Sequence, residues 1–329
     1  MNNHPATPNT FAANPQSGGN AFDVIGDIHG QAGLLCSLLS KLGYHELDNV
    51  WRHPQRTAVF VGDIIDRGPE IRESLAIVRS MVRSGTALAV IGNHEWDALR
   101  FHLDPTRYSD LKSQLETTLA QFHSHEEEWQ SCLEWFRTLP LSLDLGGFRV
   151  AHACWNTGAV ESLRSLPCPL DDKTLRLLSD ANSTEGRAAG FLINGLRLVL
   201  PGDLFVMTHR GMPMNWMRVK WWIPLNGRSY DDVAFPDLDM VPRKRIELPP
   251  ADLTTPVGIF DGYPSQASPI FFGHYSLPRH STPEPMTPNV ACLDYSVWKG
   301  GSLVCYRWDG EQTLQASKFV TTNPTQSNP

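Results

Sequence analysis

Three short stretches of the chain carry residue types that bind divalent metal ions or phosphate groups. They read GDIHG from Gly26, GDIIDRG from Gly62 and GNHE from Gly92, and each follows an apolar run. Asp, Asn and His side chains are ligands for divalent ions, and an arginine guanidinium offers planar donors to phosphate oxygens. Their combination indicates chemistry on a phosphate group at a metal centre.

The spacing of these stretches indicates how the fold brings them together. Asp27 and Asp63 are 36 residues apart, and Asp63 and Asn93 are 30 residues apart. A strand–helix–strand crossover takes roughly 30 residues, and neighbouring parallel strands end at the same edge of a sheet. We therefore predict a β-α-β-α-β unit in the first hundred residues, with helices over about 34–42 and 69–84.

Two later histidines occupy the same kind of position. Residues 141–155 are expected to form a β-hairpin, and His152 stands at the end of its second strand. His274 follows another apolar run and a glycine. The strand-like runs from this point to about residue 308 have an antiparallel pattern and are expected to complete the core.

The candidate metal ligands are carboxylates, one amide and imidazoles, namely Asp27, His29, Asp63, Asn93, His152 and His274. Six ligands are too many for one tetrahedral site and suit two divalent ions that share a carboxylate, for which Asp63 is the natural choice. Two ions about 4 Å apart can hold a hydroxide for in-line attack on phosphorus. We expect His94 to protonate the leaving oxygen, Asp66 to orient His94, and Arg67 to hold phosphate oxygens.

These motifs resemble those of the calcineurin-like metallophosphoesterases, and GDIIDRG and GNHE look most like the phosphoprotein-phosphatase branch. The chain is also similar to bacterial serine/threonine phosphatases, diadenosine-tetraphosphate hydrolases and the phosphatase module of bacterial polynucleotide kinase-phosphatases. The resemblance covers residues about 22–155 and 268–310. It implies an α/β fold of the metallophosphoesterase type, a two-sheet sandwich with a βαβαβ N-terminal half, and a hydrolase that forms no phosphoenzyme.

The resemblance also implies a role for each motif residue. One ion would be bound by Asp27, His29 and Asp63, and the other by Asp63, Asn93, His152 and His274. His94 would be the general acid, and Arg67 and Asn93 would bind the substrate phosphate. Manganese is the expected metal, with iron or zinc as alternatives.

Two departures from the family pattern leave positions open. His152 is followed by Ala and Cys where the family often has two glycines, so His209 is a fallback ligand. Asp294 matches an acid of the polynucleotide-end phosphatases and is a weaker candidate. The second phosphate-binding arginine usual in the branch is assigned to Arg210, with Arg187, Arg197 and Arg218 as rivals.

Composition divides the chain into regions. Residues 1–20 and 321–329 are expected to be disordered, residues 21–320 to form the enzyme domain, and residues about 156–256 to form an inserted cap. Within the cap, residues 187–245 carry a net charge of +4, whereas the whole chain carries −7. A basic insertion would suit an anionic substrate; an ordinary cap with exposed arginines is an equally weighted alternative.

Composition also argues against several classes of protein. A net charge of −7 disfavours general nucleic-acid binding. No apolar run reaches the roughly 18 residues of a membrane span, and the N-terminus lacks a signal-peptide pattern, so a cytoplasmic location is expected. The six scattered cysteines are expected to be mostly buried free thiols.

The motifs favour a phosphomonoesterase of the serine/threonine protein phosphatase type, acting on phosphoproteins. The alternative is a dinucleoside polyphosphate hydrolase, acting for example on diadenosine tetraphosphate, or a nucleic-acid-end phosphatase or phosphodiesterase. In the dinucleotide case the basic, Trp-rich insertion would stack on bases. A catalytically silent phosphate-binding module would have lost a ligand or His94, and the sequence retains all of them.

Overall fold

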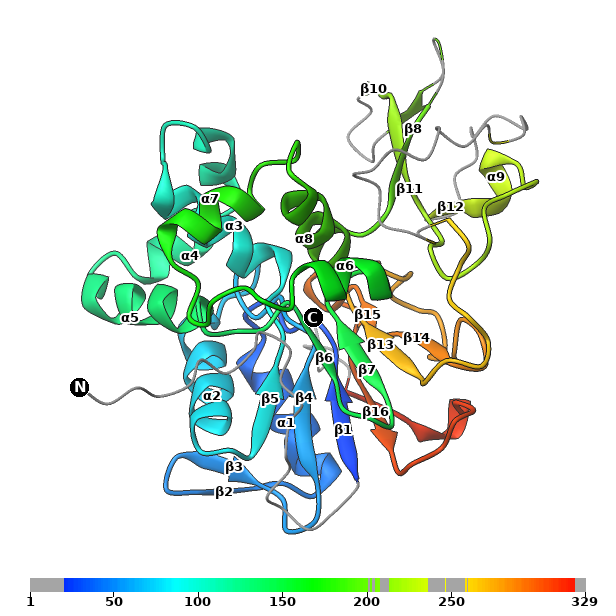
Figure 1. The fold of residues 1–329 in the computed structure, drawn as a ribbon. Coiled ribbons are helices and arrows are strands. Elements are labelled where there is room, and N and C mark those ends of the chain that lie inside the picture. The colour runs from blue at the N-terminus through cyan, green and yellow to red at the C-terminus, as the bar shows by residue number, and fades with distance from the viewer. Residues whose placement is uncertain are drawn as a thin grey trace.

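The computed structural model describes residues 21–200, 202, 205–207, 213–235, 246, 258 and 260–322. In this part of the chain two main sheets face each other, with helices on their outer sides (Figure 1). The predicted α/β sandwich is therefore confirmed. His209, Arg210 and the predicted N-terminal segment 1–20 lie outside the described residues.

The first sheet carries the three motifs. Its strands lie in the order β15 (Asp294–Tyr295), β16 (Ser302–Trp308), β1 (Phe22–Ile25), β4 (Thr57–Phe60) and β5 (Ala87–Ala89), and β17 (Phe319–Thr322) also pairs with β16. The pairs β1–β4 and β4–β5 are parallel, as predicted, whereas β1 and β16 are antiparallel. The motif loops thus leave the carboxyl ends of three adjacent strands.

The second sheet has the order β14 (Val290–Cys292), β13 (Ile270–Phe272), β7 (Arg149–Ala151) and β6 (Ser142–Asp144). The β6–β7 pair is the predicted hairpin. However, β13 is parallel to both β7 and β14, so the expected antiparallel pattern is wrong for these strands. The chain makes a long crossover between β7 and β13 and returns in the same direction. Antiparallel pairing occurs where β15 meets β16, in the first sheet.

Apolar side chains from both sheets fill the space between them. Val24, Val59, Phe148, Phe271 and Tyr306 are buried there. The Phe148 ring lies 5.5 Å from that of Phe271, and the Phe271 ring lies 4.9 Å from that of Tyr306. Dense packing of this kind leaves little room for either sheet to shift, which fixes the strand ends that carry the motifs.

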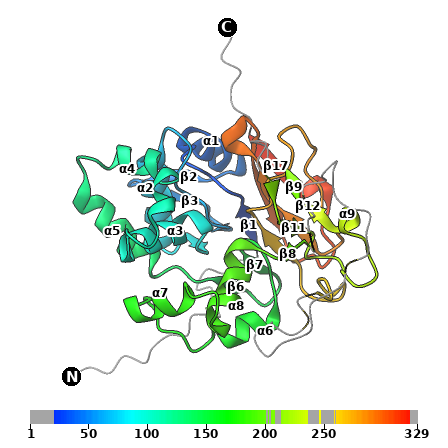
Figure 2. The same ribbon diagram turned by 90° about the horizontal axis from the view of Figure 1, so that it is seen from above.

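Helices follow the motif strands. The elements are α1 (Ala32–Leu42), α2 (Ile71–Arg83), α3 (Asn93–Leu103), η1 (Ser109–Ser113), α4 (Glu116–Gln121) and α5 (Glu126–Phe136), with the β2 (His45–Leu47) and β3 (Val50–Arg52) hairpin between α1 and β4. Helix α1 ends as predicted at Gly43, which has a left-handed φ of 93°. Figure 2 shows α2 to α5 on one side of the molecule.

The crossover between β7 and β13 contains helices and a small sheet. Its elements are α6 (Thr157–Ser162), α7 (Asp172–Leu178), α8 (Thr184–Asn194), β8 (Arg197–Val199), β9 (Val206–Met207), β10 (Pro213–Met214), β11 (Trp216–Val219), α9 (Tyr230–Val233) and β12 (Ala234–Phe235). In Figure 1 strands β8, β11 and β12 lie far from the β2–β3 hairpin. That hairpin precedes β4, so the small sheet lies toward the carboxyl ends of the parallel strands.

Two tryptophans of the crossover are core residues. Trp221 and Trp222 are only 2% and 6% exposed. Their rings lie 5.2 and 5.5 Å from the ring of Phe272 on the second sheet, and Trp222 also contacts Tyr275. Trp221 and Trp222 therefore cannot supply the base stacking expected of the Trp-rich insertion, because the fold buries them.

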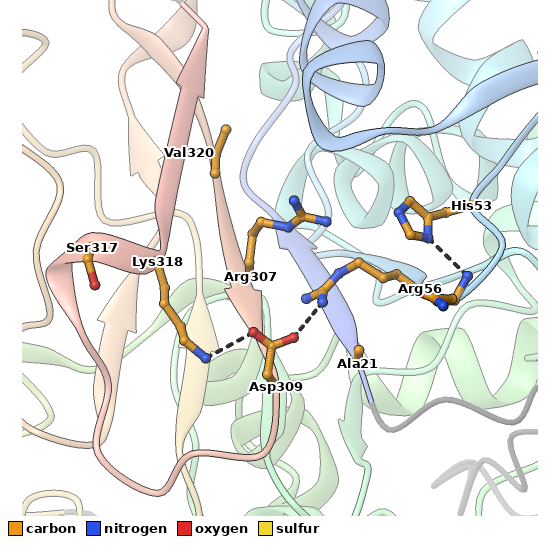
Figure 3. A pocket seen from close by; sticks show the side chains of 9 residues that line it. Ala21, His53, Arg56, Arg307, Asp309, Ser317, Lys318 and Val320 are labelled. Atoms are coloured by element: carbon orange, nitrogen blue, oxygen red, sulfur yellow. Dashed lines mark hydrogen bonds and ion pairs between the residues drawn. The ribbon is translucent and has the colours of Figure 1, made fainter.

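A network of ion pairs closes the end of the first sheet opposite the motifs (Figure 3). Buried Asp23 accepts hydrogen bonds from Arg56 Nε at 2.9 Å and Arg307 Nε at 3.0 Å. Asp309 accepts from Arg56 at 2.5 Å and from Lys318 at 3.0 Å. The basic side chains around this cavity of about 550 Å³ are thus engaged with carboxylates, and they serve to tie β1 to β16.

Three smaller features bear on the sequence predictions. The six cysteines are free thiols, four of them buried. Strand β17 continues to Thr322, so the tail predicted from residue 321 begins two residues too early. Within the described ranges, no helix combines the length and the apolar character that a membrane crossing requires.

Candidate metal centre

The loops after β1 and β4 form one hydrogen-bonded unit. The Asp63 carbonyl accepts from the backbone N–H groups of Ile28 at 3.1 Å and His29 at 2.9 Å. Gly30 N–H donates to the Ile64 carbonyl at 2.8 Å. Motifs separated by more than thirty residues are thereby held in a fixed register, as the predicted sheet edge requires.

Several non-glycine residues of the site have left-handed backbones, with φ of 46° at His29, 51° at Asp63, 68° at Asp66, 69° at Arg67 and 61° at His274. Each such residue costs about 1–3 kcal/mol and persists only where surrounding contacts enforce it. Such residues cluster at functional sites in proteins. All five carry side chains that the sequence assigned to the site.

Asp63 lies between two groups of potential ligand atoms. Its Oδ2 is 3.6 Å from His29 Nε2 and 3.8 Å from His94 Nε2. Its Oδ1 is 3.3 Å from His152 Nε2. The ligand atoms of His29, Asp63 and His94 lie within 4.8 Å of one another, and so do those of Asp63, His152 and His274. Asp63 is therefore common to both groups.

The second group includes the side chain amide of Asn93. Its Oδ1 lies 3.1 Å from His152 Nε2 and 2.6 Å from His274 Nδ1. His152 Nδ1 is bonded to the carbonyl of Val61 at 2.7 Å, which leaves Nε2 directed at Asp63. A backbone bond of this kind fixes the ring orientation of a metal-ligating histidine. The predicted strand-end position of His152 thus lies where the other candidate ligands come together.

Asp27 completes the predicted set from the neighbouring loop. Its Oδ2 accepts the backbone N–H of His274 at 3.0 Å. Its Oδ1, and the Nε2 of His274, are buried and have no hydrogen-bond partner among the described residues. Burial and the adjacent Asp294 carboxylate raise the pKa of Asp27 well above its ordinary value. These two buried atoms without partners, next to neighbouring carboxylates, are suited to bind divalent cations. A bound cation would satisfy both atoms and would balance the carboxylate charge.

Asp294 holds the loop that carries His274. Its Oδ2 accepts from Ser276 Oγ at 2.6 Å, and its Oδ1 accepts from the backbone N–H of Ser296 at 2.9 Å. Ser296 Oγ donates in turn to the Leu277 carbonyl at 2.7 Å. Both oxygens of Asp294 are therefore engaged in positioning the chain around the site.

His94 and Asp66 form a buried pair. His94 Nδ1 lies 2.5 Å from Asp66 Oδ2, and Thr118 Oγ1 donates to the other oxygen of Asp66. Burial lowers the pKa of His94, but the charges of Asp63 and Asp66 outweigh it and raise the pKa above its ordinary value. The imidazole is thus oriented by a carboxylate and favours its protonated form. Thr118 had no sequence signal.

Two arginines of the crossover lie next to the site. Arg218 Nη1 donates to the His274 carbonyl at 3.0 Å. Arg197 is the cross-strand partner of Arg218 in the β8–β11 pair. Burial and the charge of Arg218 lower the pKa of Arg197. By contrast, Arg187 donates to carbonyls just before its own helix, at residues 181 and 182, and its hydrogen bonds within the described residues include none to the second ligand group.

Glu95 is a central residue to which the sequence assigned no role. Its Oε1 accepts the backbone N–H groups of Ile64 at 2.8 Å and Ile65 at 3.1 Å. Its Oε2 accepts those of Asp63 at 2.9 Å and Gly92 at 3.0 Å. One buried carboxylate thus holds the GDIIDRG loop against the GNHE loop. The signal was its place in GNHE, where a glutamate reads as an ordinary first-turn helix residue.

Comparison with known proteins gives one family match. The pattern of the calcineurin-like phosphoesterase family matches residues 21–233. The chain is 41% identical over 108 residues to the bis(5'-nucleosyl)-tetraphosphatase PrpE [asymmetrical] of Halalkalibacterium halodurans, covering 32% of this chain and 43% of that protein. It is 36% identical over 140 residues to the protein of the same name from Anoxybacillus flavithermus, covering 40% and 56%. The chain thus spans about half the length of these curated relatives.

Solved structures share the fold. A protein serine/threonine phosphatase from Saccharomyces cerevisiae, described as similar to human phosphatase PP5, superimposes with a TM-score of 0.50. The superposition covers 96% of this chain and 83% of that chain at 14% identity. At this identity the likeness concerns the fold alone.

Replacing Glu95 tests its role in holding the loops. Glu95→Ala leaves four buried N–H groups without an acceptor, so we expect the free energy of unfolding to fall by about 3 kcal/mol or more. Glu95→Gln keeps one acceptor oxygen and should lose about half as much. Denaturant unfolding measures both variants, with the exposed Glu127→Ala as matched control. A loss in Glu95→Ala no larger than in the control would contradict the role.

The raised carboxyl pKa values predict how metal binding depends on pH. In the metal-free fold burial raises the pKa of both Asp27 and Asp294. Their contribution to stability is therefore present at low pH and lost as the pH rises through the raised values. Metal ions bound beside these carboxylates favour their ionised forms and reverse this loss.

We expect the difference in Tm between Mn²⁺-loaded and chelator-treated protein to widen between about pH 5 and pH 8. Thermal unfolding of both forms across this range measures it. A difference that stays constant, or narrows as the pH rises, would count against the predicted linkage.

Proposed function

The chain belongs to the calcineurin-like phosphoesterase family, whose members are phosphoester hydrolases, and on this premise we propose that it hydrolyses dinucleoside polyphosphates such as diadenosine tetraphosphate. The observation that carries the substrate is the identity to curated proteins named bis(5'-nucleosyl)-tetraphosphatases. These relatives favour the second of the two predicted substrates over phosphoproteins. The alignments cover 32% and 40% of this chain, so the substrate of the whole chain is a proposal.

We assign the metal ligands as the sequence predicted them. Asp63 would be shared, because it is common to both groups of ligand atoms. Asp27 supports this assignment with a buried oxygen that has no partner among the described residues. Bound divalent ions would lower the pKa of water and polarise the phosphoryl oxygens. Manganese is the proposed ion, with iron or zinc as alternatives.

Arg67 and Asn93 are proposed to bind the phosphate that reacts, together with one or both arginines of the crossover. Like charges directly opposite each other on neighbouring strands are destabilising. Arg197 and Arg218 are such a pair, and neither has a carboxylate partner in the ion pairs of the described residues. An anionic ligand would supply the missing charge. We therefore favour these two over Arg187, while Arg210 stays a prediction outside the described residues.

His94 is proposed as the general acid and Asp66 as the residue that orients it. The 2.5 Å contact between them and the raised pKa of His94 support a proton held on the imidazole. Arg67 Nη2 lies 3.2 Å from His94 Nε2, so the proposed phosphate-binding and proton-donating groups face the same space. Protonation of the leaving oxygen would then occur beside the bound phosphate.

A comparison of substrates tests the proposed function. With Mn²⁺ restored to chelator-treated protein, we expect kcat/KM for diadenosine tetraphosphate to exceed that for phosphopeptides, phosphomonoesters and bis(4-nitrophenyl) phosphate. Chromatography of the nucleotide products measures the first activity. Asp63→Asn should lose activity and metal, whereas Asp110→Asn, an exposed matched control, should keep both.

Other outcomes would overturn the proposal in defined ways. A higher kcat/KM for phosphopeptides would restore the serine/threonine phosphatase assignment. Turnover of the diester alone would favour a phosphodiesterase. Full activity of Asp63→Asn, or of the chelator-treated protein, would show that the reaction does not need the metal centre.

The role of His94 is tested with leaving groups of different basicity. His94→Asn should lower kcat for phenyl phosphate by about 10²–10⁴-fold. The loss should be much smaller for 4-nitrophenyl phosphate, because its leaving group departs without a proton. Steady-state kinetics and metal analysis of the same preparations measure this. Equal losses on both substrates would exclude a general acid, and loss of bound metal would make His94 a ligand instead.

A further inference from the structure

A short turn after β15 places a tryptophan against the exposed arginine of the DRG motif. The turn is η2 (Val297–Lys299). The Trp298 ring centroid lies 4.1 Å from Arg67 Cζ and 4.6 Å from Lys299 Nζ. The ring therefore contacts two cations, one from the GDIIDRG motif and one from its own turn. Such contacts hold a cation against the ring face by electrostatic attraction to the ring.

The backbone of this turn is firmly held. Ser296 has a left-handed φ of 55° and donates its N–H to Asp294 Oδ1. Gly300 has a φ of 82°, and Gly301 N–H donates to the Ser296 carbonyl at 3.1 Å. Asp294 also holds the loop of His274. The turn is thus tied to the same scaffold as the metal centre.

The cations around this turn form no ion pairs in the part of the chain that the structure describes. Among the ion pairs of the described residues, none involves Arg67, Lys299 or Arg279. Arg279 joins the cluster because its Nη1 donates to the Lys299 carbonyl at 3.4 Å. On a chain with a net charge of −7, three neighbouring cations without carboxylate partners favour an anionic ligand. This contrasts with the basic side chains at the opposite end of the sheet, which carboxylates engage.

Arg67 is the cation of this cluster that lies next to the proposed general acid. Its Nη2 lies 3.2 Å from His94 Nε2, so Arg67 faces the phosphate that reacts. Lys299 contacts the same aromatic ring as Arg67 and is exposed. A phosphate chain that continues past Arg67 from the reacting group would meet the exposed cations of this turn, Lys299 and Arg279.

We propose that Lys299, with Arg279, forms a second phosphate subsite for groups beyond the phosphate that is hydrolysed, and that Trp298 positions Arg67 and Lys299 around it. The subsite selects linear polyphosphates over simple monoesters. Only a polyphosphate carries further phosphate groups that could reach Lys299 and Arg279. This inference rests on the proposed function for its substrate class. The preference for polyphosphates over monoesters would then come from charged residues outside the reacting centre.

Inhibition of 4-nitrophenyl phosphate hydrolysis by inorganic tripolyphosphate and by orthophosphate tests the subsite at a fixed excess of free Mn²⁺. In Lys299→Gln we expect the inhibition constant of tripolyphosphate to rise about fivefold more than that of orthophosphate, as for one partly exposed charge contact. Lys41→Gln, in the last turn of α1, is the matched control and should change neither inhibition constant. Calorimetric titrations with tripolyphosphate and with orthophosphate give the same comparison without turnover of 4-nitrophenyl phosphate.

Replacing the tryptophan separates positioning from packing. Trp298→Phe keeps an aromatic face and should keep the preference for tripolyphosphate, whereas Trp298→Leu should weaken both inhibitors because Arg67 loses its support. If Lys299→Gln changes the two constants equally, or neither of them, the subsite does not exist. If the preference depends on Lys299 but diadenosine tetraphosphate is not hydrolysed, the subsite stands and the proposed substrate is wrong.

Discussion

The carboxylate of Glu95 is the contact on which the rest of the site depends. It arises in the first turn of α3 and accepts four backbone N–H groups from the two loops beside it. Those loops contain Asp63, Asp66 and Arg67, all with left-handed backbones that are costly in isolation. The Asp63 carbonyl then binds the loop after β1. One buried anion thereby stabilises three strand ends in a conformation that none would adopt alone.

Sequence reasoning recovered the parts that depend on local pattern. The spacing of Asp27, Asp63 and Asn93 gave the parallel order of β1, β4 and β5, because a crossover of about thirty residues leaves few alternatives. It could not give the direction of β13, which depends on the path of the crossover, or the cross-strand pairing of Arg197 with Arg218. Both are set by contacts distant in sequence. The role of Glu95 was hidden for the same reason, since three of its four partners lie about thirty residues upstream.

The proposed substrate and the distribution of charge agree with each other. The chain is acidic overall, yet the cations near the site lack carboxylate partners among the described residues, on the side of His274 and on the side of His94 alike. An enzyme for isolated monoesters needs positive charge only where the phosphate reacts. Positive charge on both sides of the reacting position suits a ligand that carries several phosphates in a row, as the curated relatives' names also indicate.

The parallel pairing of β7 and β13 has a consequence for how this enzyme could diversify. A parallel return obliges the chain to travel the length of the second sheet, and Trp221 and Trp222 pack on Phe272 along the way. The segment that brings Arg197 and Arg218 to the site is therefore also part of the hydrophobic core. It is not a module that evolution or an engineer could exchange whole, because its removal would expose a sheet face. New specificity would have to arise by point substitution on a retained scaffold.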